Sequence, residues 1–129
     1  MAYIFESALE SELLVVRVSG ERHERPEDSI ASLRDFFSGV ASEMAREHVN
    51  RLLAVISATG AIRSLNIRAF YGSLGTMGFK AGMQFAVVFA GQEHDRPILA
   101  LGVDVAERDG WTIRHFLSEP EARDWLSTA

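Results

Sequence analysis

Leu52-Leu53-Ala54-Val55-Ile56 is an unbroken run of apolar residues near the middle of the sequence, and the predicted fold is built around it. Its five apolar residues follow one another without alternation, so neither face of a strand built from them is expected to contact water. An uninterrupted apolar run is typical of a central strand in a parallel sheet that is covered on both faces. In such sheets, ligands and partners commonly meet the loops at the carboxyl ends of the strands. The segment 57–64 is therefore the first place to look for function.

The segments on either side of 52–56 predict strands and helices in alternation. Strands are expected at 3–7, 13–19, 84–89 and 111–116, and helices at 26–46, 64–74, 97–109 and 118–126. The first two strands form an antiparallel hairpin around a polar turn at 8–12, and the alternating pattern of the last strand places it near an edge. The order strand-strand-helix-strand-helix-strand-helix-strand-helix predicts an α/β fold with a mixed sheet of four or five strands, flanking helices and a single domain over 1–129.

Several residues with a specific local role mark the ends of the predicted helices. Pro26 suits the first turn of the first helix. Gly75 and Gly78 are expected to end the helix that begins near residue 64. Ser118 and Glu121 form a capping box at the start of the last helix. The apolar stripe of the first helix consists of Ile30, Leu33, Phe37, Val40 and Met44.

Composition restricts the classes of protein to which the chain can belong. The 129 residues include no cysteine and carry a net charge of -5, with Lys80 as the single lysine. The missing thiols exclude disulfides, thiolate metal sites and a cysteine nucleophile, and the acidic balance argues against nucleic acid as a partner. The sequence begins without a signal-peptide pattern, and no apolar run approaches the ~20 residues of a membrane span, which predicts a cytoplasmic location.

Two stretches of the sequence resemble the SpoIIAA-like proteins, the small bacterial branch of the STAS and CRAL-TRIO-like fold group. One is 52–74, and the other combines FAVV at 85–88, VDVAERDGW at 103–111 and FLSEPEARDWL at 116–126. The resemblance implies a STAS-like, non-catalytic regulatory or protein-binding module without a cofactor, which binds a partner protein or forms a homodimer. The surface expected to make the contact includes Ser57, Thr59, Arg63, Ser64 and Arg68.

Ser64 has a second role that the resemblance implies. In anti-sigma-factor antagonists, which are STAS proteins, an Asp-Ser-Ser/Thr-Gly motif begins the helix after the central strand, and a partner kinase phosphorylates its first serine. The matching positions here read Arg63-Ser64-Leu65-Asn66, so the serine is retained and the aspartate and glycine are not. Ser64 is a candidate phosphorylation site, and a plain helix N-cap is the alternative interpretation.

An apolar cluster that begins within this helix and continues after it supports a different function. Phe70, Tyr71, Met77, Phe79 and Met83 lie among closely spaced glycines, and Met and aromatic side chains adapt to apolar ligands. A pocket lined by these residues would make the chain a carrier or sensor of a small lipid-like molecule. The alternative is that these residues belong to the core, because apolar residues at helical spacing commonly do.

Catalysis and metal binding have less support in the sequence. Ser57, His94 and Asp95 follow neighbouring strands, which leaves an esterase-like hydrolase as a remote alternative. Neither Ser57 nor Ser64 lies in a Gly-x-Ser-x-Gly elbow. The four histidines have no ligand-like spacing, so no metal site is expected.

Overall fold

The computed structural model describes residues 3–10, 12–21, 26–57, 72, 74–80, 82–89, 110–116 and 118–127. In chain order these residues form strands β1 (Tyr3–Glu10) and β2 (Leu13–Gly20), helix α1 (Pro26–Glu47), strand β3 (Arg51–Ile56), helix α3 (Leu74–Met77), strands β4 (Gln84–Phe89) and β5 (Thr112–Phe116), and helix α5 (Glu119–Ser127). Most of the predicted helix at 64–74 and the whole of the one at 97–109 lie outside the described residues.

The strands form one mixed sheet in the order β1-β2-β3-β4-β5. β1 is antiparallel to β2, and the remaining neighbours are parallel. β3 lies in the middle of this sheet, as its apolar run predicts, and β5 lies at a border, as its alternating pattern predicts. The α/β class and the five-stranded mixed sheet are therefore confirmed.

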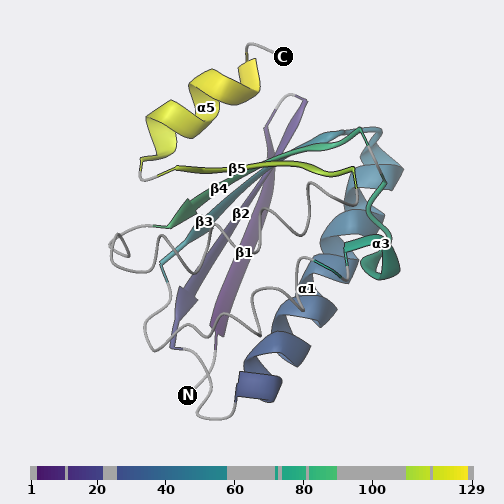
Figure 1. Ribbon diagram of the computed structural model, residues 1–129, viewed down its shortest axis with the longest axis vertical. Helices are drawn as coiled ribbons and strands as arrows, with labels where there is room; N and C mark the ends of the chain where they lie inside the picture. Colours follow the sequence, from purple (N-terminus) through teal and green to yellow (C-terminus); the bar gives the residue numbers. More distant parts are fainter. Residues whose placement is uncertain are drawn as a thin grey trace.

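Helices cover both sides of the sheet (Figure 1). From β2 to β5 the chain moves across the sheet in one direction, and right-handed crossovers between such strands fall on a single side. α1 and α3 lie on that side, which we call the α1 face, and α5 follows the last strand and covers the opposite side, the α5 face.

β3 contributes buried side chains to both faces. Leu52 and Ala54 belong to the core on the α1 face, and Leu53 belongs to the smaller core beneath α5. Leu53 is 0% exposed, whereas Val55 and Ile56, nearer the carboxyl end of the strand, are half-buried. The prediction that this apolar run avoids water is thus confirmed for its first three residues and is wrong for the last two, Val55 and Ile56.

Gly78 ends α3 in a left-handed conformation with φ 106°. The N–H of the next residue, Phe79, donates to the carbonyl oxygen of Leu74 at 3.3 Å, which is the long bond of a Schellman motif. His48, with φ 57°, ends α1 in the same way. Gly78 is the terminator that the sequence predicts, whereas Gly75 lies inside α3, so its predicted role is wrong.

The last helix begins and packs as its sequence predicts. The N–H of Glu121 donates to Ser118 Oγ at 3.4 Å, which confirms Ser118 as the N-cap. Leu126 is buried, and the ring of Trp125 lies with its centroid 5.8 Å from that of Phe116 in β5. These contacts fix α5 to the sheet.

The β1–β2 hairpin is longer than the sequence suggests. β1 pairs with β2 without interruption from Tyr3 opposite Gly20 to Glu10 opposite Leu13. The predicted turn at 8–12 is therefore wrong in its first three residues. Ala8, Leu9 and Glu10 are exposed, because an edge strand can keep its backbone bonds while its side chains face water.

Candidate interaction surfaces

The predicted contact surface begins at Ser57, directly after β3. Its backbone N–H donates to the carbonyl oxygen of Val18 at 2.8 Å, and its Oγ donates to the same oxygen at 3.4 Å. These bonds hold the carboxyl end of β3 against that of β2. Other residues predicted to act at this end lie outside the described residues: Thr59, Arg63, Ser64, Arg68, His94 and Asp95.

Three of the residues predicted to line an apolar pocket are buried. Met77, Phe79 and Met83 are 6%, 5% and 8% exposed. The ring of Phe79 meets that of Phe85 edge to face, with centroids 5.0 Å apart. All three side chains belong to the core on the α1 face. The other two predicted lining residues, Phe70 and Tyr71, lie outside the described residues.

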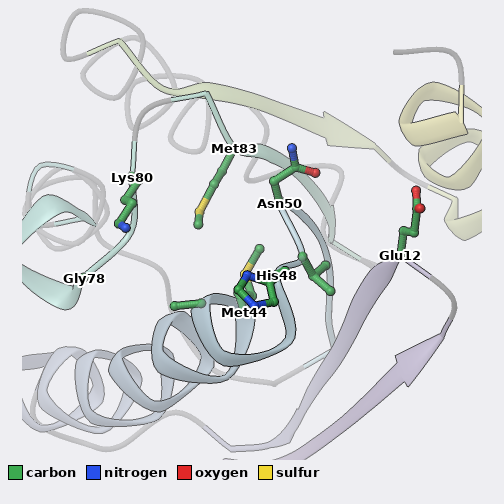
Figure 2. Close-up of a pocket in the computed structure, with 9 residues that line it drawn as sticks. Glu12, Met44, His48, Asn50, Gly78, Lys80 and Met83 are labelled. Atoms are coloured by element: carbon green, nitrogen blue, oxygen red, sulfur yellow. The ribbon is translucent and has the colours of Figure 1, made fainter.

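A hollow of about 440 Å³ opens at the opposite end of the sheet, where the parallel strands begin (Figure 2). Met44 and Met83 are buried and give it an apolar floor. Figure 2 shows Met83 pointing toward the end of α1, where His48 lies beside Met44. His48 and Lys80 are exposed at its rim. The residues that line it are Glu12, Met44, Ala45, His48, Val49, Asn50, Gly78, Lys80 and Met83.

Sequence reasoning missed this hollow because it searched the carboxyl ends of the strands. The hollow forms at the amino ends, where short connections lead from α1 into β3 and from α3 into β4. Left-handed residues make both connections tight: His48 has φ 57°, and Gly78 and Gly82 have φ 106° and 93°. In the sequence, this hollow is indicated only by Lys80, the single lysine, which lies between Gly78 and Gly82.

β1 carries the most exposed apolar side chains of the described residues. Ile4 is 58% exposed and Leu9 is 45% exposed, and they lie on opposite faces of the strand. β1 is at the border of the sheet, and within the described residues β2 alone pairs with it. Of the features that commonly keep edge strands from pairing with other chains, β1 has two exposed charges, Glu6 and Glu10, but no proline, lysine or bulge.

A chain of ion pairs ties the β1–β2 hairpin to α5. Arg17 of β2 donates to both carboxylate oxygens of Glu119, at 2.9 and 3.2 Å. Arg123 donates through Nε to Glu119 at 2.9 Å and through Nη2 to Glu10 of β1 at 3.1 Å. The hydrogen bonds from Arg17 and then Arg123 lower the pKa of Glu119, and bonding to Glu119 raises the pKa of both arginines. The charge of Glu10 is thereby balanced within the same molecule.

A second hollow, of about 600 Å³, lies between this ion-pair chain and the start of the sheet. The pair formed by Glu10 and Arg123 is part of its wall. Glu12 borders both hollows, so the end of the hairpin separates them. The lining residues are Glu10, Glu12, Leu13, Arg51, Arg123, Leu126 and Ser127.

The described part of the chain has neither a cluster of metal ligands nor a membrane-spanning helix. No group of three or more metal-binding side chains gathers there, and none of its helices has the length and apolar character to cross a membrane. No protein-family model matches the sequence, and no curated protein is significantly similar to it. The likeness to SpoIIAA-like proteins therefore rests on the motifs quoted above, and a proposal for function rests on the surfaces of the molecule.

Proposed function

We propose that this chain is a non-catalytic protein-binding module of the SpoIIAA-like, STAS-like type. The observation that carries the proposal is the open edge of β1, with Ile4 58% and Leu9 45% exposed. The five-stranded mixed sheet with helices on both faces is compatible with such a module. The motifs at 52–74 and 116–126 add the family resemblance.

The physical basis of binding is strand addition. An edge strand presents a row of backbone N–H and C=O groups, and an extended segment of a partner can bond to them. Ile4 and Leu9 lie on opposite faces, so a partner strand meets one apolar contact on each face. Main-chain bonds then provide affinity, and these two contacts provide specificity. Burying an aliphatic side chain of this size contributes about 1.5–3 kcal/mol when burial is complete.

Affinity capture from native cells tests this proposal. The wild-type chain, Ile4→Lys and Ala31→Lys serve as baits; Ala31 is exposed on α1 and provides a lysine away from the edge. We expect a partner that the wild type and Ala31→Lys retain and that Ile4→Lys loses, because a charge at the edge opposes strand addition. Capture of the same proteins by all three baits would contradict a role for β1.

Ser64 enters the same proposal as a regulatory residue. A phosphate there would change the charge beside the predicted contact surface. Phosphorylation mapping of the protein purified from native cells, under several growth conditions, tests this role. A Ser64 that stays unmodified in every condition leaves it as a helix N-cap.

A carrier of a small apolar ligand is the second candidate function. The hollow of about 440 Å³ favours it, because its floor consists of Met44 and Met83 and its rim offers the cation of Lys80. A fatty acid combines the matching chemistry: an apolar chain and a carboxylate. We expect added fatty acid to raise the unfolding temperature of the wild type.

Filling the hollow gives the matched test of this second function. Ala45→Trp places an indole at the lining, whereas Ala31→Trp places one on the same helix outside the lining. The thermal shift is expected to vanish in Ala45→Trp and to persist in Ala31→Trp. An equal shift in both variants would place the ligand elsewhere.

A further inference from the structure

We infer that β1 pairs antiparallel with β1 of a second copy of this chain, about a two-fold axis at Ser7, so that two five-stranded sheets join into one. This inference rests on the proposed function and names the partner. Its basis is the sequence of the edge strand and the faces on which its side chains lie.

Symmetry restricts the registers in which two β1 strands can pair. Two antiparallel edge strands of a continuous sheet are related by an axis perpendicular to that sheet, and this axis keeps each face on its own side. A residue on the α1 face must then lie opposite another residue on the α1 face. Tyr3 and Phe5 pack against the α1-face core, so odd-numbered residues pair with odd-numbered residues, and even with even. The axis therefore passes through a residue.

Like charges exclude two of the central registers. An axis at Glu6 places Glu6 opposite its own copy, and an axis at Ala8 places Glu6 opposite Glu10 of the second copy. Directly opposed like charges destabilise a strand pair. An axis at Phe5 avoids this repulsion but pairs the short stretch 3–7. An axis at Ser7 pairs 4–10 and places no two carboxylates directly opposite each other.

On the α1 face this register joins apolar side chains. Phe5 lies opposite Leu9 of the second copy, once on each side of the Ser7 axis. The ring of Phe5 is stacked on that of Phe36 in α1, with centroids 4.2 Å apart, so it forms a fixed surface. Leu9, which is 45% exposed in one copy, is covered by this surface. The contact buries apolar area without any change in the fold of either copy.

On the α5 face the same register keeps the two glutamates of β1, Glu6 and Glu10, from lying opposite another carboxylate. Glu6 lies opposite the small Ala8, and Ile4 lies opposite Glu10. Arg123 bonds to the carboxylate of Glu10 at 3.1 Å, which leaves the methylene groups of Glu10 to contact Ile4. Glu6 is the cross-strand neighbour of Arg17 within its own copy. Positions equidistant from Ser7 thus join Phe5 with Leu9 and place no like charges opposite each other, because Glu6 and Glu10 each keep an arginine neighbour within their own copy. This compatibility of the strand with itself is the reason for choosing a second copy as the partner.

Single-cysteine variants test this register directly, because the chain has no cysteine of its own. In Ser7→Cys the two thiols lie opposite each other across the axis, at the separation of cross-strand neighbours, which a disulfide can span. We expect copper–phenanthroline to convert Ser7→Cys to a disulfide-linked dimer at least tenfold faster than the control Ala31→Cys. Glu6→Cys and Ala8→Cys should each cross-link slowly alone and quickly when mixed, since these two positions face each other.

Light scattering on cysteine-free protein provides the second measurement. We expect a dimer in the wild type and in Ala31→Lys, and at least a tenfold weaker dissociation constant in Leu9→Lys. Fast cross-linking of Glu6→Cys or Ala8→Cys alone would overturn the register and leave a β1 contact in place. A wild-type monomer at all concentrations, with Ser7→Cys no faster than Ala31→Cys, would overturn the second copy as partner. Capture with the Ile4→Lys bait would then decide the proposed function separately.

Discussion

Burial of His115 in the last strand makes the stability of the fold depend on pH. His115 lies opposite Val87 on the α1 face, and burial lowers the pKa of His115 from 6.5 to about 4. The folded state therefore keeps this imidazole neutral, while the unfolded chain protonates it below pH 6.5. The free energy of unfolding therefore has its full value above pH 6.5 and falls as the pH drops toward 4, because over that range only the unfolded chain gains the proton.

Replacing His115 by Gln should weaken this pH dependence. We expect the free energy of unfolding of the wild type to fall by about 2 kcal/mol more than that of His115→Gln between pH 7 and pH 5. Urea denaturation at each pH measures the difference. His48→Asn is the control, because His48 is exposed and Asn tolerates its left-handed backbone. Parallel curves for the wild type and His115→Gln would contradict the assignment.

Leu53 and Leu9 should differ in the free energy of unfolding that the protein loses when each is replaced by alanine. Leu53 is 0% exposed beneath α5, whereas Leu9 is 45% exposed on the edge strand. We expect Leu53→Ala to lower the free energy of unfolding by about 2–5 kcal/mol, because it removes buried area and leaves a cavity. Leu9→Ala should cost less than about 0.5 kcal/mol in the monomer. Urea denaturation at low protein concentration, where a dimer would dissociate, measures the loss for each variant. Equal losses for Leu53→Ala and Leu9→Ala would contradict the burial of β3 beneath α5.

At the scale of the element, the ion-pair chain determines how firmly α5 holds the hairpin. The hydrogen bonds from Arg17 and Arg123 lower the pKa of Glu119 below its ordinary 4.5. The stabilisation of the folded state by these bonds is therefore complete above pH 4.5, and it is lost as the pH falls through the lowered pKa of Glu119. We expect Glu119→Gln to cost about 1 kcal/mol at pH 7 and low salt, since its partners are partly exposed.

Glu121→Gln is the matched control for this element. Both glutamates lie in the first turn of α5, so both interact with the helix dipole, and the ion pairs described here involve Glu119. Thermal unfolding at pH 7 and pH 3, with and without 1 M salt, separates the two variants. A loss in Glu121→Gln as large as in Glu119→Gln would assign the effect to the dipole.

The elements that the sequence predicts correctly are those with strong local patterns. The apolar run of β3, the N-cap at Ser118 and the stop at Gly78 each follow from a few adjacent residues. The errors occur where a distant contact decides. The residues 8–10 continue β1 because β2 pairs with them. Gly75 is a different case, because two glycines three positions apart carry the same stop signal and the left-handed turn forms at Gly78. The hollow at the amino ends requires the end of α1 and the turn after α3 to meet, and the sequence indicates it only through Lys80 and its neighbouring glycines.

For the whole molecule, the topology explains why β1 is the least covered strand. The chain crosses the sheet in one direction, so α1 and α3 share a face, and among the described elements α5 is the one on the other face. α5 has nine residues and packs on β3, β4 and β5. The hairpin is held on that face by Arg17, Arg123 and their carboxylate partners. Among the described residues, β1 consequently has one edge that pairs with no other strand.

Hydrogen exchange tests this view of the molecule strand by strand. Amides of β3 and β4 should exchange slowest, because these strands have partners on both sides and helices on both faces. Those of the border strands β1 and β5 should exchange faster in dilute protein. As the protein concentration rises, we expect protection to increase in β1 and to stay constant in β5, because pairing of two copies closes one edge alone. Ile4→Lys should remove this concentration dependence. A gain of protection in β5 that matches that of β1 would mean that the copies meet at the other border, and the charge pattern around Ser7 would then have no role in assembly.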